Sequence, residues 1–307
     1  MAEKRKNSKL TWFSAALLAV LLLVLAFLQQ NGSLDALLNG TPLQSDSGAA
    51  QKPLSVHFID VGQGDCSLIK TPNGAILIDA GERANAPAVI QYLREQKVTA
   101  LKYIIATHPH SDHIGALPDI LAAIPAENII LPQLTEINIP TTKTYENLLS
   151  AIQTHKVKAI PAKAGTSYAL GDAQLSILAP LSQMKELNDM SVIARLDFGE
   201  TSFLFSGDAE KAAEDALLAS SAALRAQVFK AGHHGSKTSS GEALLEAVRP
   251  ELVVICCGKD NSYGHPHEEA VQRFNAIGAR QLRTDICGSI VVGSDGERLY
   301  QSYENEG

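Results

Sequence analysis

The feature that most constrains the fold is a group of metal-ligand side chains at the end of one expected strand. The apolar run YIIAT, residues 103–107, is typical of a buried strand, and HPHSDH follows it immediately before a helical pattern. This loop carries His108, His110, Asp112 and His113. Imidazole and carboxylate groups bind Zn²⁺, Mn²⁺ or iron, and a strand-to-helix loop can turn alternate side chains toward one point. The loop therefore predicts a metal site.

Short apolar or β-branched runs alternate with helical patterns from about Pro53 onward. The expected helices lie at residues 86–96, 114–124, 145–155, 210–220, 241–248 and 268–277. Residues 196–205 have the pattern of an antiparallel hairpin, and strands joined by so few residues exclude a purely parallel barrel. We therefore expect an α/β (α+β) fold with two sheets packed face to face and helices outside, a four-layer αββα sandwich.

The N-terminus predicts a membrane anchor. Residues 10–28 are apolar except for Thr11 and Ser14, and they follow a basic tail at residues 1–9. The stretch is long enough to cross a bilayer, and the basic residues favour keeping residues 1–9 in the cytoplasm. A cleaved signal peptide is the alternative, but no small-x-small site follows Leu28 directly. We expect a single-pass cell-membrane protein whose catalytic part is extracytoplasmic.

Residues 29–52 are rich in Gly, Ser, Asn and Gln and are expected to form a linker, followed by one hydrolase domain at residues 53–307. The length and the 45% hydrophobic content suit one large domain. The net charge of −7 argues against electrostatic tracking along a nucleic acid. It does not exclude a phosphodiester held mainly by bound cations.

The four cysteines fit no zinc-finger spacing. Cys256 and Cys257 are adjacent in an apolar run and are expected to be small core residues. A disulfide between Cys66 and Cys287 is an open alternative, because an extracytoplasmic domain would meet an oxidising environment.

Several further motifs occur in a fixed order around the HPHSDH loop. They are FIDVGQGDCSLI at 58–69, LIDAG at 77–81, NDMSVIARLDFG at 188–199, FLFSGD at 203–208, KAGHHGSKTSS at 230–240 and NSYGHPH at 261–267. Together they resemble the metallo-β-lactamase superfamily and, within it, the metallo-β-lactamase domain of ComEC-type competence proteins. The resemblance runs from about Val56 to Val292. ComEC-type proteins also carry a multi-span channel region, whereas one span is expected in this sequence.

The resemblance implies metal ligands at six positions: His108, His110, Asp112, His113, Asp208 and His233. Asp208 matches a carboxylate that bridges two metals. Of the adjacent pair, His233 is favoured as the ligand, which leaves His234 nearer the substrate. The cofactor is expected to be one or two ions of Zn²⁺ or Mn²⁺.

The first metal position lacks an expected third histidine. His155 is the only histidine between residues 114 and 207, and it is expected on a surface helix. Asn188-Asp189-Met190-Ser191 stands where the ligand would be. The first site is therefore expected to be weaker, to use an oxygen ligand or to stay empty.

Four residues are expected to act in catalysis: Asp79, Asp112, His234 and His265. Asp79 would orient a ligand or the metal-bound water. His265 would contact the leaving group or phosphate, with a tucked loop histidine as the alternative. His267 and His57 are expected to be structural.

Substrate contacts are expected from two loops. Gly62 and Gly64 would let the backbone amides of the loop ending at Asp65 approach an anionic oxygen, while Ser236, Lys237 and Thr238 add donors. A tight turn and a solvated loop are the alternatives.

These features predict hydrolysis of phosphodiesters, in DNA or another phosphoester polymer, by a metal-bound hydroxide. A separate DNA-uptake channel protein is the expected partner. One alternative is a carbonyl hydrolase acting on a lactam, lactone or thioester. Another is a noncatalytic module that binds nucleic acid or cell wall.

Overall fold

The computed structural model describes residues 44–305, which contain two β-sheets. The nine-stranded sheet has the order β1-β16-β15-β2-β3-β4-β5-β6-β7. Its strands are β1 (Gln44–Ser45), β2 (Leu54–Phe58), β3 (Ser67–Thr71), β4 (Gly74–Ile78), β5 (Leu101–Ile105), β6 (Ala126–Leu131), β7 (Lys158–Pro161), β15 (Ile290–Ser294) and β16 (Leu299–Tyr303). The seven-stranded sheet has the order β14-β13-β12-β11-β10-β9-β8. Its strands are β8 (Ser167–Leu170), β9 (Ala173–Ala179), β10 (Ile193–Phe198), β11 (Thr201–Phe205), β12 (Val228–Lys230), β13 (Leu252–Ile255) and β14 (Arg280–Arg283).

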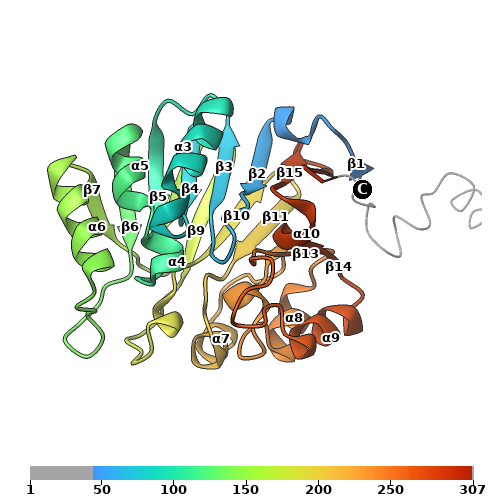
Figure 1. Cartoon of the computed structure of the whole chain (residues 1–307). Coiled ribbons are helices and arrows are strands. Elements are labelled where there is room, and N and C mark those ends of the chain that lie inside the picture. Colours follow the sequence, from blue (N-terminus) through green and yellow to red (C-terminus); the bar gives the residue numbers. More distant parts are fainter. Residues whose placement is uncertain (1–43, 306–307) are drawn as a thin grey trace, which may run out of the picture. The chain divides into compact units, whose positions relative to one another are not determined.

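The helices fall into two groups along the chain. The first group is α3 (Ala86–Glu95), α4 (Ser111–Ile114), α5 (Leu117–Ala123) and α6 (Lys143–Thr154). The second is α7 (Lys211–Leu218), α8 (Glu242–Val248), α9 (Glu268–Ala276) and the short α10 (Thr284–Cys287). Four 3-10 turns lie between these elements: η1 (Ala49–Gln51), η2 (Arg83–Asn85), η3 (Asn188–Met190) and η4 (Gly232–Gly235). In Figure 1, α3 to α6 gather beside β3 to β7, and α7 to α9 lie near β13 and β14.

Alternation along the strands explains the layers. Leu68 of β3 packs with α3, α5 and α6 in one core, whereas its neighbour Ile69 is buried on the opposite face of the sheet. In the second sheet, Phe229 of β12 packs with α7 to α9 in another core. Between the sheets, Phe58 of β2 stacks on Phe205 of β11 with ring centroids 6.1 Å apart. Both sheets are thus covered on both faces, and the expected αββα sandwich is confirmed.

The strand directions gather the loops that matter for function. Strands β4, β5 and β6 are parallel, as are β11, β12 and β13, so within each sheet the loops after these strands leave at one edge. Those loops carry the HPHSDH motif, Asp79, Asp208 and the pair His233-His234. The expected hairpin is β10 followed by β11, which pair antiparallel.

Three features differ from the sequence-based expectations or extend them. Residues 44–52 were assigned to the linker, but β1 pairs with β16 and Ala49 is fully buried, so the ordered chain begins before Pro53. The helix expected at 114–124 begins later, as α5 at Leu117, and follows the separate short helix α4; Pro118 lies in the first turn of α5, where no N–H is needed. Cys66 and Cys287 are buried thiols, and no disulfide joins them.

The expected cytoplasmic tail at 1–9, the anchor at 10–28 and most of the linker lie outside the described residues. Among residues 44–305, no helix has the length and apolar character that crossing a bilayer requires.

Candidate metal centre

Asp79 follows β4 and fixes the loop that follows β5. Its Oδ1 accepts a hydrogen bond from the backbone N–H of Thr107 (2.8 Å), and its Oδ2 accepts one from the Thr107 hydroxyl (2.6 Å). Oδ2 also lies 2.8 Å from Nδ1 of His113. A proton on Nδ1 leaves Nε2 of His113 free to face the site, so Asp79 has the position of a carboxylate that orients a metal ligand.

Two histidine nitrogens converge on one carboxylate oxygen, Oδ2 of Asp208. Nε2 of His113 lies 3.2 Å from it and Nε2 of His234 lies 3.5 Å from it. His234 Nε2 is also 3.2 Å from Oδ2 of Asp112. These residues come from the loops after β5, β11 and β12, so the group exists only because two sheets bring their strand ends together. We call His113, His234, Asp112 and Asp208 the second group.

The two adjacent histidines have different surroundings. His234 is buried, and its Nδ1 lies 2.9 Å from the carbonyl oxygen of Cys256, which leaves Nε2 for the second group. His233 is partly exposed: its Nδ1 lies 3.0 Å from Glu210, and its Nε2 lies 3.7 Å from Asp208. The sequence favoured His233 as the ligand and His234 as the residue nearer the substrate, whereas the structure places His234 inside the group and His233 at its edge.

The backbone of η4 explains this arrangement. Both His233 (φ 47°) and His234 (φ 54°) have left-handed conformations, which cost about 1–3 kcal/mol each for a residue other than glycine. This turn directs the second side chain of the pair inward, because side-chain direction in a loop follows local φ and ψ rather than distance from the strand.

His108 and His110 form a first group that also approaches Asp208. Nε2 of His108 lies 3.0 Å from Nδ1 of His110 and 3.7 Å from Oδ2 of Asp208. Oδ2 of Asp208 is thus near histidines of both groups, and its role as a bridging carboxylate stays a prediction. His155 is exposed at the C-terminal end of α6, in agreement with its expected surface position.

The charges of the second group depend on one another. Burial opposes a positive charge on His113, but Asp208 and Asp79 outweigh it and hold the pKa of His113 well above its usual value. Asp208 and Asp65 likewise raise the pKa of His234 against the effect of burial. Although burial opposes it, the attraction to His113 and His234 holds the pKa of Asp208 well below its usual range.

The residues present fit a divalent cation. Nε2 of His113 and Oδ1 of Asp208 are buried without a hydrogen-bond partner, although His113 Nε2 lies close to the other Asp208 oxygen. One ligand atom from each of Asp65, His113, Asp208 and His234 lies within 4.8 Å of the others. Imidazole nitrogens and carboxylate oxygens together suit Zn²⁺, Mn²⁺ or iron.

Asp65 has a different position from the one expected of a substrate contact. It is buried and forms an ion pair with the buried Lys230, and its Oδ1 lies 3.2 Å from Nδ1 of His234. Asp65 thus stands behind the His234 ring, on the side away from Asp112. Because its charge is already balanced by Lys230, we consider Asp112 rather than Asp65 the fourth member of the second group.

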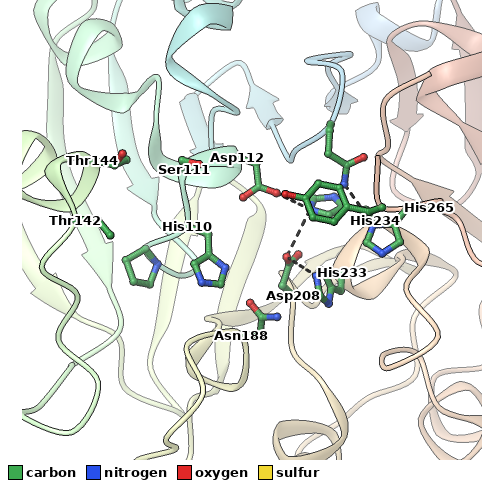
Figure 2. A pocket seen from close by; sticks show the side chains of 13 residues that line it. His110, Ser111, Asp112, Thr142, Thr144, Asn188, Asp208, His233, His234 and His265 are labelled. Carbon is green, nitrogen blue, oxygen red and sulfur yellow. Dashed lines mark hydrogen bonds and ion pairs between the residues drawn. The ribbon is translucent and has the colours of Figure 1, made fainter. Parts of the chain in front are cut away.

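The two groups open into a cleft of about 440 Å³ (Figure 2). The expected substrate residues Gly62, Gly64, Ser236 and Lys237 do not line it. Gly64 instead packs against the carbonyl oxygen of Asp112, where a Cβ would not fit. Four lining residues had no predicted role, Gln63, Thr142, Thr144 and Tyr263, and a fifth, Asn188, stands at the position of the missing histidine. Gln63, Asn188 and Tyr263 lie inside motifs that the sequence singles out, whereas Thr142 and Thr144 lie outside them.

His265 lines the cleft as a neutral imidazole. Burial and the neighbouring His234 lower its pKa to about 4. Oε1 of Gln63 accepts a hydrogen bond from the backbone N–H of Gly258 (3.2 Å), so the Gln63 amide nitrogen must face Nδ1 of His265, 3.4 Å away. The ring proton therefore lies on Nε2. His267 and His57 have structural contacts, as expected.

The sequence profile of the Metallo-beta-lactamase superfamily matches residues 59–259. The chain belongs to this superfamily.

Two relatives of this chain are ComEC-type competence proteins, which confirms the resemblance to that branch of the superfamily. ComE operon protein 3 of Bacillus subtilis is 29% identical over 76% of this chain and 32% of its own length. Recombination protein 2 of Haemophilus influenzae is 30% identical over 80% of this chain and 29% of its own length. The chain thus spans about a third of these relatives. The metallo-beta-lactamase fold protein YhfI of Bacillus subtilis matches 82% of this chain and all of its own at a TM-score of 0.52 and 12% identity, which supports the fold alone.

Proposed function

We propose that the chain is a metal-dependent phosphodiesterase that cleaves DNA or a related phosphoester outside the cytoplasm. The observation that carries the proposal is the buried cluster around Asp208, which opens into a cleft with histidine and amide groups on its walls. A divalent cation held there would promote deprotonation of water near neutral pH and offset negative charge on the attacked phosphoryl group. The similarity to competence proteins supports DNA as the substrate.

The protein's own residues supply the orientation. Asp79 fixes His113 from behind through Nδ1, and the Cys256 carbonyl and Asp65 lie at Nδ1 of His234. In each case the nitrogen that faces Asp208 is left without a proton when a cation binds. Ligands held in this way need little reorganisation, which strengthens binding.

His265 would hold the substrate or the leaving group. At neutral pH its ring is uncharged, with the donor proton on Nε2. That N–H would donate a hydrogen bond to a phosphoryl oxygen or to the departing oxygen. A neutral His265 ring competes with the cation for the carboxylates of Asp112 and Asp208 less strongly than a protonated ring would.

The test uses purified protein beginning at Gln44, freed of metal and then given Mn²⁺ or Zn²⁺. We expect cleavage of single-stranded DNA and of bis-p-nitrophenyl phosphate only with metal present. His110→Ala and Asp208→Ala should each lose at least about a hundredfold in rate, because each removes a ligand or the bridging charge. His155→Ala, on the surface, is the matched control and should behave as wild type.

Nitrocefin and a lactone, assayed in parallel, separate the rival activities. Hydrolysis of either without cleavage of a phosphodiester would make the chain a carbonyl hydrolase. Retention of DNA on a metal-loaded protein that hydrolyses none of these compounds would make it a binding module. Full activity in both ligand variants would overturn the mechanism.

The membrane position is a separate part of the proposal. The apolar stretch 10–28 and its basic flank support an anchor with the catalytic domain outside the cytoplasm and a separate uptake channel as partner. An alkaline phosphatase fused after Lys52 should be active in intact bacterial cells. An inactive but stable fusion would reject this orientation.

A further inference from the structure

The first group has one ligand fewer than the second group. His108 and His110 approach Asp208, and the histidine expected from the connection between β9 and β10 is absent. Asn188, the first residue of η3, stands in that connection and lines the same cleft as His110 and Asp208. Its side chain is therefore placed to complete the first group with oxygen instead of nitrogen.

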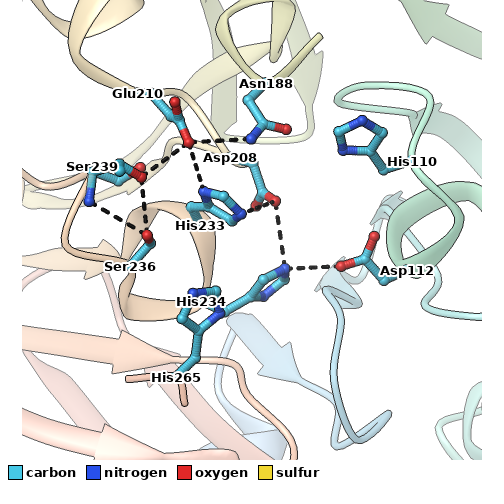
Figure 3. A network of polar contacts seen from close by, with 12 residues as sticks. His110, Asp112, Asn188, Asp208, Glu210, His233, His234, Ser236, Ser239 and His265 are labelled. Atoms are coloured by element: carbon cyan, nitrogen blue, oxygen red, sulfur yellow. Dashed lines mark hydrogen bonds and ion pairs between the residues drawn. The ribbon is translucent and has the colours of Figure 1, made fainter. Parts of the chain in front are cut away.

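The orientation of the Asn188 amide is fixed by Glu210. Oε1 of Glu210 accepts a hydrogen bond from Nδ2 of Asn188 (3.3 Å) and also contacts Nδ1 of His233 and the hydroxyl of Thr238. A carboxylate accepts hydrogen bonds and cannot donate them, so the amide nitrogen must face Glu210. The amide oxygen must then point the other way, and in Figure 3 it lies on the side of His110.

That oxygen has the same character as the atoms of the metal cluster. Within residues 44–305, the buried side-chain nitrogen and oxygen atoms that lack a hydrogen-bond partner belong to Asp65, His113, Asn188 and Asp208. Burying such an atom is unfavourable unless something binds it. His113 and Asp208 belong to the second group, Asp65 lies directly behind His234, and Asn188 is the remaining one.

The two neighbouring polar residues of the connection, Asp189 and Ser191, are already engaged. Both backbone N–H groups of Glu210 and Ala213 donate to Oδ1 of Asp189 (3.1 Å each), which anchors the start of α7. The Ser191 hydroxyl accepts from the backbone N–H of Asp208 (3.0 Å) and lies near Nδ1 of His108, behind that ring. Asn188 is thus the residue of this segment that lines the cleft and has a side-chain oxygen without a hydrogen-bond partner.

We propose that Oδ1 of Asn188 is a ligand to a divalent cation at the first group, together with His108, His110 and Asp208. The proposal rests on the proposed function in assuming that the cluster binds metal, and it names the missing ligand. A neutral amide oxygen in place of a third imidazole makes the site harder, which favours Mn²⁺ over Zn²⁺ relative to a site with three histidines. The first position therefore binds its cation more weakly than the second and discriminates less in favour of Zn²⁺.

The experiment is a metal titration of the metal-free full chain without substrate. Calorimetry follows Zn²⁺ and Mn²⁺, and electron paramagnetic resonance follows free Mn²⁺. Wild type should show two classes of site. Asn188→Leu, similar in size but without the oxygen, should weaken one class at least about tenfold and leave the other unchanged. Asn188→His should restore that class and shift its preference toward Zn²⁺.

Two further variants define the result. His108→Leu should weaken the same class as Asn188→Leu, which identifies it as the first position. Gln183→Ala lies in the same connection but does not line the cleft, and it should bind as wild type. Melting of each metal-free variant shows whether it is folded, and Asn188→His tests the ligand role even if Asn188→Leu fails to fold.

The proposal is overturned if Asn188→Leu binds both cations like wild type, if it weakens both classes equally, or if wild type has one class of site. An unchanged Zn²⁺ preference in Asn188→His also rejects it. Because no substrate is present, a two-class wild type that cleaves no phosphodiester would reject the proposed activity while leaving the ligand assignment intact.

Discussion

The two histidines of the GHHG turn, residues 232–235, differ in their expected function because the turn gives each one different neighbours. His234 is buried against Asp112 and Asp208, while His233 contacts Glu210 at the edge of the cleft. We expect His234→Ala to lower metal affinity by about a hundredfold or more, since a buried ligand is lost. His233→Ala should change it only a few-fold. Metal content after dialysis, measured by mass spectrometry, compares the two; the reverse order would make His233 the ligand.

Metal binding should depend on pH through the same residues. The carboxylates raise the pKa values of His113 and His234, so without metal these rings stay protonated at neutral pH. Their protonated forms stabilise the metal-free protein fully below about pH 6.5, and this stabilisation is lost as pH rises through the raised pKa values. A cation must displace these protons, so its affinity should fall as pH falls, about tenfold per pH unit for each proton released.

Calorimetry in buffers of different ionisation enthalpy measures this proton release directly. His155→Ala, whose ring is exposed, should release the same number as wild type. Binding near pH 7 without proton release would contradict the raised pKa values.

Among the elements, β1 and η1 extend the domain beyond the boundary that the sequence indicated. Ala49 lies against Gly293 of β15, where a Cβ would clash with the Ala49 carbonyl oxygen. Gly293→Val should destabilise the protein by about 1–3 kcal/mol, even though valine suits strands, because the space is filled. Urea unfolding provides the measurement.

A deletion of residues 44–51 supplies the control for this clash. In the shortened protein the same substitution should be much less costly, because the opposing carbonyl is gone. An equal penalty in both backgrounds would mean that residues 44–51 do not pack on β15.

The helices and most strands could be predicted because their signals are local. The apolar spacing of α3, α6 and α9 is visible within each segment, and the observed bounds agree closely with the expected ones. The segment at 44–52 has no such signal: its order comes from pairing with β16, far away in the sequence. Polar, Gly-rich composition indicates a linker only when no distant strand offers a partner.

At the scale of the whole molecule, the cleft has no permanently charged basic side chain. Among the described residues that line it there is no lysine or arginine, and the net charge of the chain is −7. DNA binding should therefore depend strongly on the bound cation and weakly on salt, with a slope of log affinity against log salt shallower than about −2. Filter binding over a range of salt concentrations measures the slope.

Adding a positive charge to the cleft tests the same prediction. Thr144→Lys should steepen the slope by about one, since one more phosphate contact releases one more counterion, while Thr144→Gln should not. A steep slope in wild type would reveal a basic track on another surface.

The sequence alone determined the superfamily resemblance, the αββα architecture and the HPHSDH loop, because strand and helix patterns are local and the motif's ligands lie within six residues. The tertiary structure decided which histidine of the GHHG turn points inward. It also decided that Asp65 pairs with Lys230 behind the His234 ring, and that the Asn188 oxygen faces His110. The physical reason is that loop side chains take their direction from backbone torsions and from partners supplied by other strands. Neither is visible in the spacing of residues along the chain.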